Sequence, residues 1–321
     1  MSNCLVTGGA GFVGSHLVEE LANNGNTVVV LDNFSNGHMK NLSSLHDSNI
    51  YRWDVQICHE IDFKHRGKDI IFDQIYHLAT APRSSSLVNP FQDIETNCKG
   101  MIAVLELARK HNAKVVFTSN SGIAYNNPKA SGSIHEFAPN NPTTPYDTDK
   151  LASEYYCKIY HNIYGVKSCI VRFATVYGER QVVNEALNWR PLVATFVKNV
   201  MNHEGVIING DGEQTRDLIY VKDAVQGVVK AMESDVNNAD IFLLSTNTET
   251  SVNKVYSTVA KTIGHFTPID YTEPLPGDIK RMRYSYEKAH KTFGFEPKYT
   301  LNDGIERMIK FLRAQTEYTN S

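Results

Sequence analysis

The stretch CLVTGGAGFVG, residues 4–14, constrains the fold of this chain more than any other feature. Its first residues are apolar and predict a buried strand, and a helical pattern resumes through Leu17, Val18 and Leu21. Its three spaced glycines permit a sharp strand-to-helix turn, a close approach of phosphate oxygens to the backbone, and tight packing of the helix on the strand. The pattern predicts a turn that binds a dinucleotide.

A second β-rich run, Thr27–Leu31, ends on Asp32. A carboxylate at the end of this strand accepts hydrogen bonds from a ribose diol and repels the additional phosphate of NADP. Asp54 follows a third short strand, residues 49–52, where it can hydrogen-bond an adenine edge. The residues therefore favour NAD as the cofactor.

Composition restricts the partners of the chain. The 321 residues carry a formal net charge of −3, which gives no sign of a nucleic-acid or anionic-membrane partner. The five cysteines are scattered and the 12 histidines show no metal-ligand spacing, so we expect neither a disulfide framework nor a metal site. No apolar run approaches the roughly 20 residues of a membrane span. The first strand begins close to Met1, which argues against a signal peptide, and we expect a cytoplasmic protein.

Strand-like and helix-like segments alternate through the first half of the chain. Further strands are expected at residues 74–79, 114–118 and 166–173, and helices at 91–110 and 146–164. This alternation predicts an α/β fold, a Rossmann-type doubly wound parallel sheet covered by helices on both faces. In the first of these helices, one side is expected to carry Ile94, Met101, Val104, Leu105 and Ala108.

Past Tyr177 the pattern loosens into shorter elements and polar loops. It predicts a smaller α/β substrate-binding lobe over the carboxyl ends of the strands, where ligands bind in such folds. We expect an NAD-binding domain at residues 1–175 and the substrate lobe at 176–321. Part of 218–245 is expected to pack back on the sheet.

Tyr146 and Lys150 lie four residues apart at the start of a predicted helix, so their side chains share one face. The ordinary pKa of tyrosine, about 10, is too high for a base at neutral pH. A nearby ammonium together with a positive nicotinamide ring would favour the phenolate. Ser121 comes soon after the strand at 114–118 and would hold a substrate hydroxyl against the phenol in the same cleft. Taken alone, Tyr-x-x-x-Lys can arise by chance and Ser121 can be a turn residue; their combination favours catalysis.

Further stretches match, in order, the motifs of one family. They are TGGAGFVG at 7–14, DNFSNG at 32–37, HLA at 77–79, PY at 145–146 with Lys150, VYG at 176–178, GDGEQTRD at 210–217 and PGD at 276–278. With these motifs the chain resembles the extended short-chain dehydrogenases/reductases, and among them the NAD-dependent sugar-nucleotide epimerase/dehydratase family, over nearly its whole length.

The resemblance implies a catalytic set of serine, tyrosine and lysine, which this chain supplies as Ser121, Tyr146 and Lys150. It implies that NAD is bound by Gly8, Gly11, Phe12, Val13, Asp32, Asn33, Ser35, Asn36, Gly37, Asp54, Val55, Leu78, Ala79, Thr80, Thr96, Tyr146 and Lys150. It implies that a nucleotide-sugar substrate contacts Ser121, Tyr146, Thr175, Arg216 and Met282. Arg216 would grip the nucleotide diphosphate, and Met282 stands at the position that often limits sugar size. A homodimer formed through the helices at 91–110 and 146–164 is also implied.

The two residues after Ser121 bear on the reaction. In dehydratases and decarboxylases of the family, an acid follows the catalytic hydroxyl residue within two positions and moves a second proton; Gly122 and Ile123 cannot. We therefore expect C4 epimerisation of the UDP-glucose/UDP-galactose type, through transient oxidation to a 4-keto sugar with Tyr146 as acid and base. A 4,6-dehydratase, a decarboxylase, and an epimerase acting on a uronic acid or N-acetylhexosamine stay open. A non-catalytic NAD-binding sensor is least favoured, because Tyr146 and Lys150 are both present.

Three departures from the family pattern stand out in the sequence. Thr175 replaces a frequent asparagine, residues 124–126 read Ala-Tyr-Asn in place of Val-Tyr-Gly, and two acids separate Tyr146 from Lys150. We expect the carboxylates of these acids, Asp147 and Asp149, to point to solvent. A carboxylate facing inward would oppose formation of the phenolate.

Overall fold

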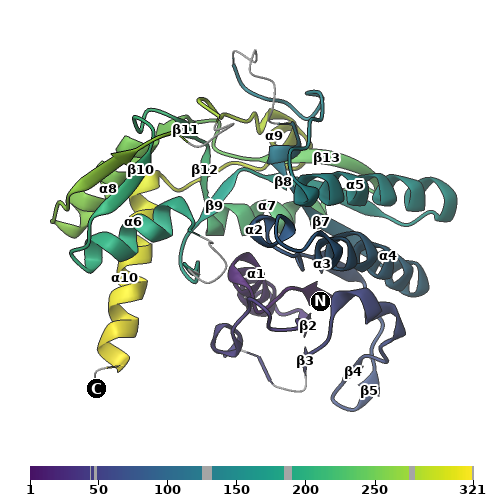
Figure 1. The fold of residues 1–321 in the computed structure, drawn as a ribbon. Helices are drawn as coiled ribbons and strands as arrows, with labels where there is room; N and C mark the ends of the chain where they lie inside the picture. Colours follow the sequence, from purple (N-terminus) through teal and green to yellow (C-terminus); the bar gives the residue numbers. More distant parts are fainter. Residues whose placement is uncertain (44, 47–48, 125–131, 184–189, 275–278, 320–321) are drawn as a thin grey trace.

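A parallel sheet of seven strands forms the centre of the molecule (Figure 1). The computed structural model describes residues 1–321 except 44, 47–48, 125–131, 184–189, 275–278 and 320–321, and no side chain past residue 315. The PGD motif and two of the residues at 124–126 therefore lie outside the described residues. The strand order is β13-β8-β7-β6-β1-β2-β3 and every pairing is parallel. These strands are β1 (Asn3–Thr7), β2 (Thr27–Leu31), β3 (Ile50–Tyr51), β6 (Gln74–His77), β7 (Lys114–Asn120), β8 (Ser168–Phe173) and β13 (Asn238–Leu244).

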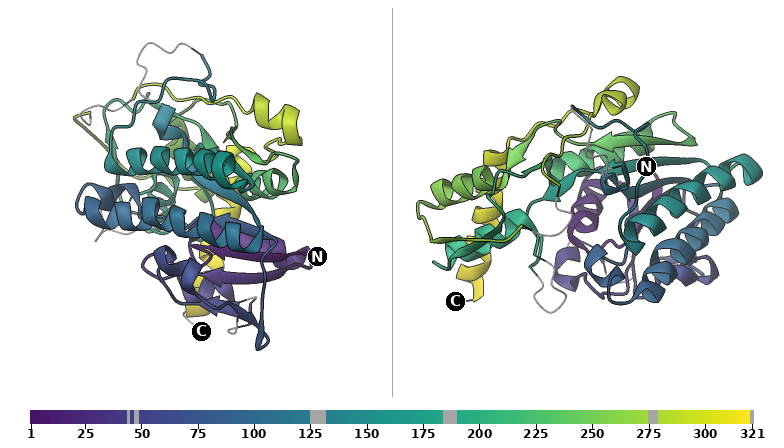
Figure 2. Two further views of the ribbon diagram at one scale, coloured as in Figure 1. Left: turned by 90° about the vertical axis from the view of Figure 1, so that its right-hand side faces the viewer. Right: turned by 45° about the horizontal axis from the view of Figure 1, so that its top comes forward.

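Successive side chains of each strand point to opposite faces of the sheet, so the apolar strand residues contribute to two cores, one on each face. Leu5 and Ile75 face one core, whereas Val6 and Tyr76 face the other. The first core is closed by α4 and α5, which lie side by side, and the second by α1 and α7 (Figures 1 and 2). These four helices are α1 (Phe12–Asn23), α4 (Gly100–His111), α5 (Pro145–Tyr164) and α7 (Val221–Glu233). The predicted fold class, a doubly wound α/β sheet, is confirmed.

The helical stretch at residues 90–111 is interrupted once. α3 (Pro90–Ile94) passes into a π-helical turn (Glu95–Lys99) before α4 begins. A π turn holds more than the usual residues per turn, so the helical periodicity shifts there. The prediction that Ile94 shares the buried side of Met101 is therefore wrong, because Ile94 is 50% exposed and Met101 is fully buried.

The second half of the chain adds a lobe beside the sheet (Figure 1). Its elements are β9 (Thr175–Tyr177), α6 (Leu192–Met201), β10 (Val206–Asn209), β11 (Thr215–Arg216), β12 (Leu218–Tyr220), β14 (Thr250–Ser251), α8 (Val252–Ile263), β15 (Ile269–Thr272), α9 (Glu287–Phe293) and α10 (Leu301–Thr319). β10 pairs with β15, β11 with β14 and β9 with β12. The first half also holds the short elements β4 (Lys64–His65), β5 (Lys68–Asp69) and α2 (Arg83–Ser86).

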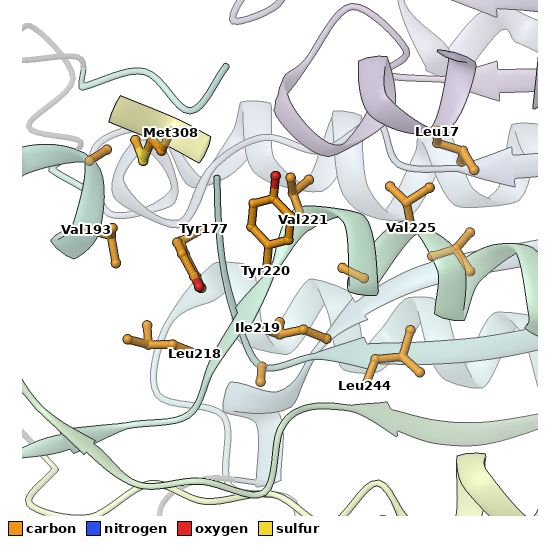
Figure 3. Packing of buried hydrophobic residues seen from close by; sticks show 14 of the residues in the cluster. Leu17, Tyr177, Val193, Leu218, Ile219, Tyr220, Val221, Val225, Leu244 and Met308 are labelled. Atoms are coloured by element: carbon orange, nitrogen blue, oxygen red, sulfur yellow. The ribbon is translucent and has the colours of Figure 1, made fainter. Parts of the chain in front are cut away.

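One apolar cluster joins the lobe to the sheet. Figure 3 shows Tyr177, Tyr220 and Met308 packed in the same cluster as Val221 of α7 and Leu244 of β13. α7 contacts both β7 and β8, so this part of 218–245 lies on the sheet. Because the core is continuous, the division at residue 175 stays a prediction. Within the described residues, no helix combines the length and the apolar character that crossing a membrane requires.

Candidate active site

The turn from β1 into α1 is shaped by two contacts that only glycine allows. Gly8 has a φ of +71°, and a Cβ there would lie 2.7 Å from the backbone nitrogen of Ala79. A Cβ on Gly14 would lie 2.1 Å from the Gly8 carbonyl oxygen, so α1 begins against the end of β1. The N-cap residue of α1, Gly11, offers no side-chain hydrogen bond to the first-turn amides. Those amides are available to an anion, as a bound pyrophosphate requires.

A cavity of about 530 Å³ opens at this turn. Its wall contains every residue that the sequence assigns to the cofactor, from Gly8 to Lys150. The glycine cradle, the uncapped helix start and the carboxylate of Asp32 all fit a dinucleotide. A second, shallow hollow of about 790 Å³ lies between the end of α7 and the start of β13, and it holds none of the predicted site residues. The described residues contain no cluster suited to a metal ion.

Asp32 is held in place by the backbone. Its Oδ2 accepts from the Ala10 amide at 2.9 Å and its Oδ1 from the Phe34 amide at 2.8 Å. Burial raises the pKa of this carboxyl, and the two amide donors work in the opposite direction. Each carboxylate oxygen can still accept a further hydrogen bond from a ribose hydroxyl. Asn33, the next residue, donates to Asp54 at 2.7 Å, so the second predicted cofactor acid is bound to the neighbour of Asp32.

Asp147 fastens the start of α5 to the end of β7. Its Oδ1 accepts from the Asn120 amide group at 2.8 Å, and its Oδ2 accepts from the backbone and hydroxyl of Thr143. Thr144 caps the helix through the Asp147 amide. The prediction that Asp147 and Asp149 point to solvent is wrong: they are 1% and 7% exposed. Asp147 turns inward because it bonds the neighbouring strand end, and Asp149 because it packs against α3.

Tyr146 and Lys150 meet at the cavity wall. The Lys150 ammonium lies 5.7 Å from the centre of the Tyr146 ring and donates to the Thr118 carbonyl at 3.1 Å. Burial raises the pKa of Tyr146 to about 12, and the carboxylates of Asp147 and Asp93 act in the same direction. Burial lowers the pKa of Lys150 to about 8. Beside this ammonium, the pKa of the buried phenol therefore stays above its ordinary value.

A buried ion pair holds α5 against the sheet. Glu154, one turn beyond Lys150, receives two hydrogen bonds from the Arg172 guanidinium of β8, at 2.8 and 2.6 Å. Ser119 of β7 donates to the same carboxylate at 2.6 Å. Neither charged side chain is more than 2% exposed. Breaking such a pair leaves an uncompensated buried charge, so it fixes where the helix lies over β7 and β8.

The predicted substrate residues are less closely gathered. Ser121 directly follows β7 and is 4% exposed, and it is not part of the cavity wall. Thr175 begins β9, and its amide donates to the Asp217 carbonyl. Arg216 donates to the Thr215 and Ile279 carbonyls, and the Met282 amide donates to the Thr215 hydroxyl. Arg216 and Met282 are thus neighbours in the lobe, outside the cavity wall.

Several residues of the cavity wall were not predicted from the sequence. They include Trp53, Thr118, Ser119, Phe173 and Arg180. Phe173 ends β8 and Thr118 lies near the end of β7, so their place at the carboxyl edge of a predicted parallel sheet was the available signal. Arg180 follows Gly178 after β9, and no pattern in the sequence marks that turn as part of the site.

Comparison with known proteins gives consistent matches. The model of the NAD-dependent epimerase/dehydratase family matches residues 4–244. The UDP-glucose 4-epimerase of Mycolicibacterium smegmatis is 31% identical over 98% of this chain and 99% of its own length. UDP-glucuronic acid decarboxylase 1 of Xenopus tropicalis is 30% identical over 98% of this chain and 73% of its own length. The crystal structure of UDP-glucose 4-epimerase from Thermotoga maritima, with UDP-glucose, superposes with a TM-score of 0.89 at 32% identity, over 98% and 99% of the two chains.

Asp32→Asn should weaken the preference for NAD over NADP. The substitution keeps an oxygen that accepts from the backbone and removes the charge that repels a 2′-phosphate. Hydrogen bonds to a charged group contribute about 1.5–3 kcal/mol, so the ratio of the two dissociation constants should fall by about tenfold or more. Calorimetric titration with each dinucleotide measures it, with the exposed Asp62→Asn as control. Tighter binding of NADP than of NAD by the unaltered protein would contradict the role of Asp32.

Proposed function

The chain belongs to the NAD-dependent epimerase/dehydratase family, and from that premise we propose that it inverts C4 of a UDP-sugar, exchanging UDP-glucose and UDP-galactose. NAD is the cofactor, and the residues of the cavity wall would hold it: the α1 amides its pyrophosphate and Asp32 its ribose. Sequence identity does not choose the reaction, since epimerases and decarboxylases match almost equally well.

The observation that carries the proposal is the residue pair after Ser121. Gly122 has no side chain, and Ile123 is fully buried. Among the described residues, Asp32 and Asp54 supply the carboxylates of the cavity wall, and both are expected at the adenosine end of the cofactor. A dehydratase or decarboxylase needs a further ionisable group near the sugar, and neither this turn nor the described wall supplies it. Epimerisation at C4 needs one acid and base.

Tyr146 is that acid and base in the proposal. NAD held by the cavity wall would supply the hydride acceptor for C4 of the sugar and the hydride donor for its reduction on the opposite face. As the 4-keto sugar forms, the Tyr146 phenolate takes the proton of the C4 hydroxyl, and the phenol gives it back on reduction. Lys150 stabilises the phenolate by its charge, and Ser121 would hold the C4 oxygen against the phenol. No proton leaves the site over the cycle.

The lobe is proposed to hold the nucleotide and to limit the sugar. Arg216 is half-buried, and the planar, permanently charged guanidinium group is of the kind that binds a diphosphate. Met282 packs partly buried against the core of the lobe, and its flexible side chain suits a hexose. Epimerases of a uronic acid or an N-acetylhexosamine are the alternatives within this mechanism.

Tyr146→Phe should lower turnover by about 10²- to 10⁴-fold, because it removes the acid and base and leaves the ring packing unchanged. NAD affinity and melting temperature should stay near those of the unaltered protein. Initial rates, calorimetry and thermal unfolding measure the three quantities. Tyr271→Phe, at an exposed tyrosine on β15, is the control. A Tyr146→Phe enzyme that keeps most of its rate would place the base elsewhere.

The product should have the mass of the substrate. With UDP-glucose, UDP-galactose or UDP-glucuronate, we expect any product to differ from its substrate only in configuration at C4, because Gly122 and Ile123 cannot move a second proton. Mass spectrometry and NMR of the product decide between the reactions. A product lighter by water indicates a dehydratase and one lighter by carbon dioxide a decarboxylase, and either result rejects the proposal.

An apolar patch on α3 and α5 supports the homodimer that the family resemblance implies. On α5, Tyr155, Ile159 and Ile163 are 54%, 44% and 66% exposed at four-residue intervals, which places them in one stripe. On α3, which packs against α5, Phe91 is 81% exposed and Ile94 is half exposed. Exposed apolar residues gathered over two adjacent helices are typical of a protein interface.

Ile159→Glu combined with Ile163→Glu should convert the dimer into a monomer, because two charges would be buried without partners in the interface. Light scattering coupled to size-exclusion chromatography measures the mass. Ile207→Glu, at a comparably exposed isoleucine on β10, serves as control and should leave the mass unchanged. A monomeric unaltered protein would refute the homodimer.

A further inference from the structure

Two buried carboxyl groups face each other behind the active site. Asp93 of α3 and Asp149 of α5 are 1% and 7% exposed, and their side chains lie within hydrogen-bonding reach. The Oδ2 atom of each has no donor among the described residues. Two ionised carboxylates repel strongly when they lie this close in a buried place, and a shared proton removes that repulsion.

A line of hydrogen bonds leads from this pair to the phenol of Tyr146. Asp93 Oδ1 accepts from the Asn97 amide nitrogen at 2.9 Å. Asn97 Oδ1 in turn accepts from the Thr80 hydroxyl at 2.8 Å and from the Ala81 amide at 3.1 Å. The Thr80 hydroxyl is hydrogen-bonded to Tyr146. Asn97 lies in the π-helical turn, which brings its side chain inward, where it is 2% exposed.

The partners fix the direction of each bond. The Asn97 oxygen must face the Ala81 amide, which can only donate, so the Asn97 nitrogen faces Asp93. Thr80 has one hydroxyl proton, whose acceptors are the Asn97 oxygen at 2.8 Å and the Ala81 carbonyl at 3.1 Å, so a neutral Tyr146 donates to Thr80. A phenolate instead needs Thr80 to donate to it. Greater negative charge on Asp93 strengthens the hydrogen bonds that Asn97 makes. It therefore opposes the turn of the Thr80 hydroxyl from Asn97 to Tyr146.

We propose that Asp93 and Asp149 share one proton and act as positioning residues that set the pH range in which Tyr146 ionises. The inference rests on the proposed function only in treating Tyr146 as the base. The charged and titratable groups around the pair are Lys150, Asp147 and Tyr146 on α5 and Cys98 on the π turn, with Arg83 of α2 bound to Asp147 at 3.5 Å.

The pair also makes stability depend on pH. Burial, followed by the neighbouring Asp149 carboxyl, raises the pKa of Asp93 to about 7 from an ordinary value of 3.8. The folded chain therefore holds a proton between about pH 4 and pH 7 that the unfolded chain releases. Stability conferred by this proton is present at low pH and is lost as the pH rises through the folded pKa.

The Asp149→Asn variant tests the effect of the shared proton on stability, in a measurement that needs no turnover. The asparagine amide can donate to Asp93 Oδ2, so the shape is kept, and Asp93 no longer faces a second carboxyl. In the NAD-bound protein, the melting temperature of the variant should exceed that of the unaltered protein at about pH 8, and the difference should shrink towards about pH 5. Asp93→Asn repeats the test from the other side, and the exposed Asp270→Asn is the control.

The pH dependence of kcat distinguishes this role from a purely structural one, which would leave it unchanged. In the unaltered protein, loss of the shared proton above about pH 7 adds a negative charge near Tyr146 and holds back its ionisation. In Asp149→Asn, the pair site carries one negative charge, that of Asp93, at both pH values. The variant's ratio of kcat at about pH 8.5 to kcat at about pH 6.5 should be larger by roughly threefold, the change that half a pKa unit makes. Asp270→Asn should leave the ratio unchanged.

Infrared spectra report the proton directly. Between about pH 6 and pH 8.5 the unaltered protein should lose a protonated-carboxyl band that either variant lacks. The inference is overturned if that band is absent, or if a folded variant keeps the pH dependence of the unaltered protein in melting temperature and kcat ratio. The proposed function fails separately, through a product of changed mass, because the melting and infrared measurements need no turnover.

Discussion

The close contact between the start of α1 and the end of β1 is the constraint on which the rest of the structure depends. The α-carbon of Gly14 lies so close to the Gly8 carbonyl that a Cβ there would be 2.1 Å from the oxygen, which leaves no room for a side chain. That contact sets the direction of α1 and places its first amides at the mouth of the cavity, and the missing Cβ of Gly8 separately lets the loop after β6 pass beside it. The proposed phosphate site and the packing of α1 on its face of the sheet follow from the contact.

Charged groups position α5, which carries the proposed acid and base, whereas steric fit positions the turn proposed to bind phosphate. Asp147 binds the end of β7, and Glu154 binds Arg172 and Ser119 beneath it. These bonds lie on either side of Lys150 along α5 and leave little freedom for the helix to slide. The cost falls on the Tyr146 phenol, whose pKa is raised by burial and, to a smaller extent, by the carboxylates of Asp147 and Asp93. Precise placement of the helix and easy ionisation of the phenol therefore compete within α5, and in the proposed reaction the positive charge of NAD would favour the phenolate.

Features that depend on local spacing could be predicted from the sequence. The glycine turn, Asp32 at a strand end and the Tyr146–Lys150 spacing lie within single elements, and each lines the cavity as expected. Burial of Asp147 and Asp149 could not be predicted in this way, because their partners Asn120 and Asp93 come from other elements. The exposure of Ile94 could not be predicted because the π turn at Glu95–Lys99 shifts the helical period. The sequence of that turn resembles the sequence of an ordinary helix.

The edge strand β13 has a consequence for how the chain is made. It pairs with β8, although the whole of α6 and α7 and several short strands are synthesised between them. A ribosome must therefore pass Leu244 before the sheet can acquire its last strand. Until then β8 presents an unpaired edge of apolar residues, the kind of surface that recruits a neighbouring chain. During that interval the edge of β8 is open to pairing with another strand, and a fragment ending near residue 175 would keep the open edge permanently.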